Sequence, residues 1–370
     1  MVDCRRLLRT LAVFLAIFNL SVEGAEPLPD DVAMRKLTDL RETVESTCGC
    51  IDEKIPITLL TADWPDDLMP TVRATLSMIL REPRVQIPPW AVGVFARRNG
   101  EGAAPLVPYV AASLPGAEPR DAVELLCAIR SIGPRANPLE EIVRSKCNDP
   151  NAVVAIHAAS ALVRIAPTRR YPRGVLLSYL SSDRPEDRWR AADAIARTGA
   201  SDERWSQRLR ELLKDGDVRV RVTSAFALWR STNDPAVTFP VLVASLTERD
   251  ASLATAFEYP SRPGDSHRAY AIQAILDLGD SGKPALRDII AVVKGVASTD
   301  TVNSDFHSVV GIVALNAIGK LGPVSEREFK EIEASVECEE CAFAIVRDEA
   351  RRVLSRLRKS LPRKSDNRVE

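Results

Sequence analysis

The stretch DRPEDRWRAADAIARTGASDERWSQRLRELLKD, residues 183–215, holds two helix-like segments joined by a short turn. Its first segment ends in the signature AIART before Gly199, and related signatures recur along the chain. They begin 33 residues apart, at Ala128, Ala161, Ala194 and Ala227. A fixed period of this size, with one apolar stripe per helix, is typical of stacked helical repeats. The sequence therefore predicts an all-α protein, a right-handed α-solenoid of stacked antiparallel helix pairs.

The helix pairs can be placed from their boundary residues. The most regular repeats predict first helices at 119–132, 151–165 and 185–198, and second helices at 138–147, 174–181 and 203–214. Asp149, Asp183 and Asp217 stand just before first helices, where a carboxylate accepts hydrogen bonds from free backbone N–H groups. Gly133 and Gly199 follow first helices, where a left-handed cap favours glycine.

A known family shares this pattern. The segment DGDVRVRVTSAFALWRS, residues 215–231, runs from an aspartate through Val-Arg to the Ala-Leu signature. It resembles the HEAT-like repeats of the bacterial phycobilin-lyase type, and the resemblance covers about residues 88–357. The motifs W-x-x-L-G-x-x-Y and TPLHxA, which mark tetratricopeptide and ankyrin arrays, do not occur. The resemblance implies a helical solenoid. Because proteins with these repeats include chromophore lyases, it also admits such an enzyme.

The period breaks twice in the C-terminal third of the chain. The next signatures begin at Ala274 and Ala317, after steps of 47 and 43 residues. The longer steps predict insertions at 248–266 and 295–306, and long loops of repeat proteins often serve recognition. The predicted organisation is a signal peptide at 1–25, an N-terminal helical cap and connector at 26–87, the solenoid at 88–360 and a disordered tail at 361–370.

The N-terminal residues predict export. Three arginines precede the apolar run LAVFLAIFNL at 11–20, and small residues follow up to Ala25. This order is typical of a secretory signal that is cleaved after the apolar run. An uncleaved anchor is the alternative, although about 20 apolar residues are needed to cross a bilayer. We expect a periplasmic or secreted protein with no transmembrane span in the mature chain.

Export would bring the cysteines into an oxidising compartment, where they can form disulfides. Cys127 and Cys147 fall on the two helices of one predicted pair, and they form either a bridge or two buried thiols. Cys338 and Cys341 form a C-x-x-C motif, for which we favour a structural disulfide. Thiol oxidoreductase chemistry is the alternative for this motif, although no βαβ pattern surrounds it.

The sequence lacks the usual motifs of a catalytic or cofactor site. His157, His267 and His307 lie in different repeats without the spacing of a helical metal site, and we expect them at the surface or at helix starts. No G-x-S-x-G, P-loop or G-x-G-x-x-G motif occurs. We therefore predict no catalytic residue, no metal and no cofactor.

Charge is balanced over the whole chain but not along it. The formal net charge is −1, which gives no overall field toward nucleic acid, so no nucleic-acid partner is expected. Residues 120–234 hold 20 Lys plus Arg against 15 Asp plus Glu, a balance of +5. Residues 235–346 hold 9 against 16, a balance of −7. Such unevenness either steers a partner or reflects solvated faces of the solenoid.

These observations together predict an exported, non-enzymatic α-solenoid that binds a protein partner. We expect contact at its curved surface and at the insertions, where Phe257 and Tyr259 are aromatic residues of the kind enriched in binding hot spots. Arg169, Arg170 and Tyr171 form a second candidate, which is basic and aromatic. Two other function classes stay open: a chromophore lyase or assembly enzyme, and a thiol oxidoreductase.

Replacing Phe257 and Tyr259 by Ala separates two roles of the first insertion. If the rings bind a partner, its capture is lost and the melting temperature changes little. If they cover the neighbouring repeat, the melting temperature falls because buried aromatic area is lost. A thermal melt combined with partner capture measures both, and unchanged values of both would contradict either role.

Overall fold

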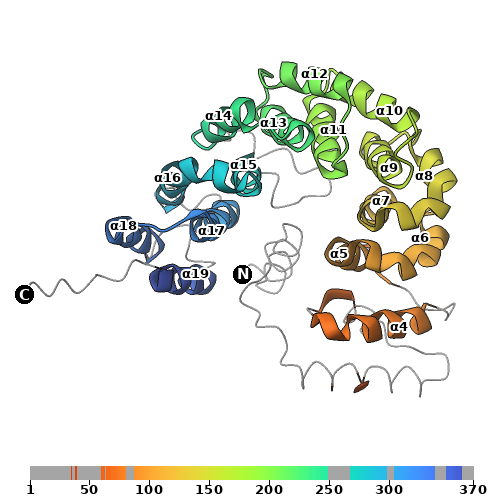
Figure 1. Cartoon of the computed structure of the whole chain (residues 1–370), viewed down its shortest axis with the longest axis horizontal. Helices are drawn as coiled ribbons and strands as arrows, with labels where there is room; N and C mark the ends of the chain where they lie inside the picture. Colours follow the sequence, from red (N-terminus) through yellow and green to blue (C-terminus); the bar gives the residue numbers. More distant parts are fainter. Residues whose placement is uncertain are drawn as a thin grey trace, which may run out of the picture. The chain divides into compact units, whose positions relative to one another are not determined.

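The computed structural model describes residues 35, 38, 39, 60–62, 64–80, 87–248, 267–297, 304–337 and 347–360. Within these residues every regular element is an α- or 3-10 helix, and no strand occurs. The predicted all-α class is therefore confirmed. The chain divides into two compact units between Arg208 and Leu209. Figure 1 shows the helices coloured along the sequence.

The first unit alternates first and second helices of successive pairs. Its elements are η1 (Asp66–Leu68), α4 (Met69–Ile79), α5 (Pro89–Asn99), η2 (Gly100–Leu106), α6 (Val107–Ser113), α7 (Pro119–Ile132), η3 (Gly133–Leu139), α8 (Glu140–Lys146), α9 (Ala152–Ile165), α10 (Tyr171–Leu180), α11 (Pro185–Thr198) and the start of α12 (Glu203–Leu212). The predicted first helices at 119–132 and 185–198 coincide with α7 and α11. The predicted second helices differ from α8, α10 and α12 by a few residues at their ends.

The first helices of this unit form one row. α5 packs against α7, α7 against α9 and α9 against α11, while α8 and α10 also pack against α9 (Figure 1). Ser160 Oγ on α9 donates a hydrogen bond to the Ala194 carbonyl on α11 at 3.1 Å, and Arg164 Nη1 donates to the Thr198 carbonyl at 3.4 Å. Each bond joins residues 34 apart, close to the period of the signatures. The contacts therefore connect consecutive repeats.

Helix α9 shows why these rows are rich in alanine. Every residue from Val154 to Val163 is buried, so the helix is enclosed on all sides. A helix in that position needs an apolar surface all round, with small residues where its neighbours approach. Ala158, Ala159 and Ala161 have no exposed surface. Their small side chains allow α7 and α11 to pack on opposite flanks of the same helix.

The N-terminal ends of the first helices follow the predicted capping only in part. Asp217 accepts a backbone N–H of the first turn of α13 (Val218–Thr232) at 2.8 Å, as predicted. At α9 the cap is Asn151 rather than Asp149, and its side chain accepts a first-turn N–H at 3.0 Å. At α11 the predicted cap by Asp183 is wrong, because Arg184 occupies the N-cap position and no side chain caps the helix. Proline at the first position of α11 has no N–H to cap.

The glycine caps also differ from one repeat to the next. Gly199 ends α11 in the left-handed conformation, with φ 64° and ψ 11°, as predicted. Gly133 ends α7 with φ 67° but ψ −140°, outside the left-handed helical region. Both positions require the positive φ that glycine adopts without a Cβ clash.

The second unit has the same alternation. Its elements after α12 are α13, α14 (Pro235–Ser245), α15 (His267–Asp277), η5 (Gly279–Ala285), α16 (Leu286–Ala297), α17 (Ser304–Leu321), α18 (Glu326–Glu337) and α19 (Arg347–Ser360). α13 packs against α15, α15 against α17 and α17 against α19, while α14 and α16 pack against the row from the side (Figure 1). Pairing of alternate helices therefore persists after the period has lengthened.

Several predicted features lie outside the described residues. These are the signal segment, Phe257 and Tyr259 in the first insertion, Cys338 and Cys341, and the C-terminal tail. The predicted domain boundaries stay predictions. In the described part of the chain, no helix has both the length and the apolar character required to cross a membrane.

Placing a charge in the seam between α9 and α11 tests this packing. Ala194 is 1 % exposed, so Ala194→Asp buries a carboxylate among apolar side chains. We expect a loss of unfolding free energy of roughly 3 kcal/mol or more, measured by denaturant unfolding. Ala112→Asp is the control because Ala112 is exposed on α6, and there we expect a loss below about 1 kcal/mol. Equal losses in the two variants would contradict the placement of Ala194 in the seam.

Candidate functional site

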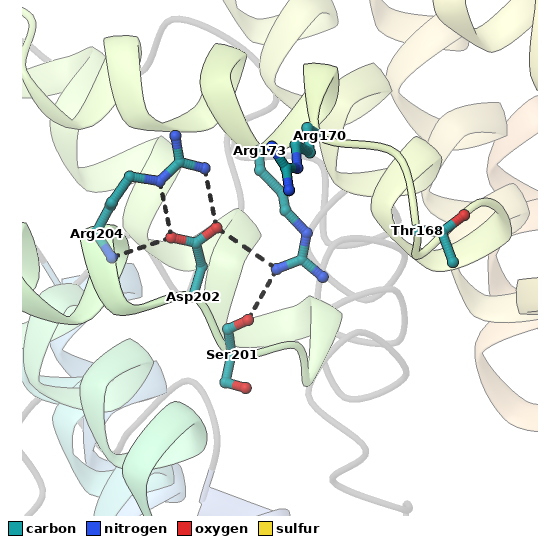
Figure 2. A pocket seen from close by; sticks show the side chains of 6 residues that line it. All are labelled: Thr168, Arg170, Arg173, Ser201, Asp202 and Arg204. Carbon is teal, nitrogen blue, oxygen red and sulfur yellow. Dashed lines mark hydrogen bonds and ion pairs between the residues drawn. The ribbon is translucent and has the colours of Figure 1, made fainter.

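An open pocket lies between two successive turns of the first unit. Its volume is about 470 Å³, and it is lined by Thr168, Arg170, Arg173, Ser201, Asp202 and Arg204 (Figure 2). Thr168 and Arg170 belong to the turn before α10, and Ser201 and Asp202 belong to the turn before α12. The pocket therefore exists because the repeats bring the starts of α10 and α12 together.

Arg173, on the first turn of α10, is held from several directions. Its Nη1 donates to the Ser201 carbonyl at 2.8 Å, and its Nη2 donates to the Pro167 carbonyl at 3.3 Å. The guanidinium lies over the ring of Trp205, 5.2 Å from the centroid. Trp205 is fully buried and its Nε1 donates to the Arg173 carbonyl at 3.0 Å. These contacts hold the Arg173 side chain in one position at the edge of the pocket.

Asp202 stands between two arginines, as Figure 2 shows. Arg204 donates from Nε and Nη2 to its two oxygens, each at 3.2 Å, and Arg173 Nη1 lies 3.8 Å from Oδ2. The backbone N–H of Arg204 also donates to Asp202 Oδ1 at 3.0 Å, so the carboxylate caps the start of α12. Burial by itself would raise the pKa of Asp202, but the hydrogen bonds from Arg204 and the charges of both arginines lower it below its usual value. Asp202 is therefore ionised at neutral pH.

Arg170 differs from the other two arginines. It is exposed at the start of α10, and it has no ion pair or side-chain hydrogen bond within the described residues. The lining residues thus carry three guanidinium groups and one carboxylate, a formal balance of +2. The positive ends of α10 and α12 add to this potential. The pocket has the electrostatic character of an anion site.

The predicted basic and aromatic cluster is only partly assembled. Arg169 Nε donates to Glu140 Oε1 at 2.8 Å, and it does not line the pocket. Tyr171 is 44 % exposed, and its hydroxyl donates to Asn148 Oδ1 at 2.8 Å. Of the three predicted residues, only Arg170 lines the pocket.

Sequence reasoning missed Asp202 and Arg204 and did not connect them with Arg173. The three residues lie on two different repeats, and no motif marks them. The repeat period was the available signal, because Arg173 and Arg204 lie 31 residues apart, close to one repeat. Aligning the turns by that period would have placed them side by side.

Cys127, Cys147 and His157 are buried in the first unit, away from the residues that line the pocket. Cys127 and Cys147 are free thiols and both are buried, which is the second of the two sequence alternatives. Cys127 Sγ lies 3.4 Å from His157 Nδ1, and Arg130 Nη2 lies 3.6 Å from the same sulfur. The expected surface or helix-start position is wrong for His157, which is 8 % exposed in the middle of α9.

The environment of Cys147 keeps its thiol in the protonated form. Burial raises its pKa to about 12, and the nearby charge of Arg144 offsets only part of this rise. Its thiol donates to the Val143 carbonyl at 3.6 Å. The thiol therefore stays protonated at neutral pH. No group of His, Cys, Asp and Glu residues suited to hold a metal ion occurs within the described residues.

No family model matches the chain, and no curated protein matches it. Among solved structures, the chain resembles two crystal structures of engineered proteins from the Northeast Structural Genomics Consortium. The first has 18% identity and a TM-score of 0.37, with 97% of this chain and 99% of that chain covered. The second has 19% identity and a TM-score of 0.33, with 60% and 98% covered. The resemblance to HEAT-like repeats stays a prediction.

Proposed function

We propose that the protein is an exported, non-enzymatic α-solenoid of HEAT-like repeats that binds a protein partner. The proposal is supported by the rows of alternate helices, in which each first helix packs on the next within its unit. In such arrays the apolar stripes are buried by contacts between neighbours, so recognition falls to exposed turns and to the curved surface of the array. The predicted signal segment supports export.

The observation that carries the proposal is the pocket between the starts of α10 and α12. It is built from two consecutive turns, and it combines a fixed arginine, Arg173, with an unpaired one, Arg170. Tyr171, which follows Arg170 and is the first residue of α10, is exposed. Arginine and tyrosine are enriched where binding energy concentrates in protein interfaces. We therefore place a partner contact on this side of the first unit.

Site-specific photocross-linking in the native cells tests this placement. Tyr171 is replaced by photoreactive benzoylphenylalanine, and Trp90 at the start of α5 is replaced in the same way as a control. The two side chains are both aromatic and similarly exposed, at 44 % and 39 %. We expect irradiation at position 171 to give one discrete adduct with another protein, identified by mass spectrometry, and position 90 to give much less of it. Equal adducts at both positions, or none at 171, would contradict the proposed contact.

A further inference from the structure

We infer that the pocket between the starts of α10 and α12 binds the carboxylates of an acidic segment, two at a time. This inference rests on the proposed function, because it states which chemistry the protein partner presents there.

The hydrogen-bond donors that the pocket leaves unused suit one type of ligand. Arg170 has its whole guanidinium available, and Arg204 keeps Nη1 after binding Asp202 through Nε and Nη2. The hydroxyls of Thr168 and Ser201 also have no partner within the described part of the chain. The lining residues thus offer donors in excess, and Asp202 is the only carboxylate among them. A ligand that supplies acceptor oxygens and negative charge completes this arrangement.

Charge and shape favour carboxylates as that ligand. Three guanidinium groups against one carboxylate leave a balance of +2, which two further carboxylates neutralise. The planar fork of Arg170 matches a carboxylate with two parallel hydrogen bonds, and Nη1 of Arg204 can donate to a second one. A volume of about 470 Å³ falls within the size range of ligand sites and exceeds the needs of a single ion. Side chains of Asp or Glu on a peptide therefore suit the pocket.

The same residues disfavour nucleic acid. Single-stranded nucleic acids are held by aromatic faces on which bases stack. Trp205, the aromatic side chain beneath Arg173, is fully buried and its face is covered by that arginine. The residues that line the pocket therefore offer positive charge to an anion, but none of them is an aromatic residue on which a base could stack.

Asp202 makes the inference testable in both directions. Its carboxylate occupies Arg204 and faces Arg173, so it competes with an incoming carboxylate. Asp202→Asn removes the negative charge and keeps a side chain that caps a helix start well. This variant is expected to bind an acidic peptide more tightly than the natural protein, whereas loss of Arg170 is expected to weaken binding.

The experiment measures binding of a fluorophore-labelled hexaglutamate peptide to the full chain by fluorescence anisotropy at low ionic strength. Arg170→Ala is compared with Arg169→Ala. The control removes the same charge from the neighbouring residue, whose side chain does not line the pocket. We expect Arg170→Ala to weaken binding about tenfold and Arg169→Ala to change it by less than about twofold. We expect Asp202→Asn to strengthen binding by about threefold or more. Circular dichroism confirms that each variant is folded.

Equal weakening in Arg169→Ala and Arg170→Ala would overturn the inference, because general surface charge would then explain binding. Weaker binding by Asp202→Asn would also overturn it. A parallel titration with inorganic phosphate covers the third outcome: binding of phosphate that depends on Arg170, without binding of hexaglutamate, would replace the peptide by a small tetrahedral anion. If hexaglutamate fails while position 171 still cross-links to a partner, the inference falls and the proposed function stands.

Discussion

Close packing between first helices of neighbouring repeats is the constraint on which the other features of the first unit depend. α9 is buried along almost its whole length, and its alanines leave room for α7 and α11 on opposite flanks. The same packing fixes the relative height of the turns that connect each pair. The turn before α10 thereby comes to lie beside the turn before α12, and the pocket follows from that placement. Larger side chains in the seam would shift the turns as well as the helices.

Within the pocket, one carboxylate serves both the fold and the site. Asp202 caps α12 and positions Arg204, and it lies close to Arg173. Because the pKa of Asp202 in the folded chain is below its usual value, the ionised carboxylate stabilises the fold at neutral pH. That contribution is lost as the pH falls through the lowered pKa. Arg173 is held by other groups as well, because two backbone carbonyls accept its hydrogen bonds and its guanidinium lies over the ring of Trp205.

The sequence predicted those parts of the fold that local chemistry determines. The bounds of α7 and α11 could be predicted because proline begins each helix and glycine ends it. The predicted bounds of the second helices were less accurate. For example, α8 begins after a 3-10 segment that no residue pattern indicated. The cap expected from Asp183 failed because the chain enters α11 through Arg184 and Pro185.

The site was harder to predict because its residues meet across repeats. Arg170 was identified from local charge, but its grouping with Asp202 and Arg204 depends on how two turns align. The contact between Cys127 and His157 has the same origin, as the two residues lie 30 positions apart on adjacent first helices. A list of motifs treats such residues singly. The repeat period contains the missing information only when it is applied to turns as well as to helix signatures.

Deleting one whole repeat tests the central claim, which is that stability comes from packing between consecutive repeats. Removal of residues 152–184 joins the cap Asn151 to Pro185, the first residue of α11, and preserves the 33-residue phase. Removal of residues 152–167 is the control, because it deletes α9 alone and breaks the phase. We expect the first variant to keep the helical circular-dichroism signal per residue of the full chain and to melt cooperatively, while the control loses both. Loss of helical signal and of cooperative melting in both variants would contradict the account.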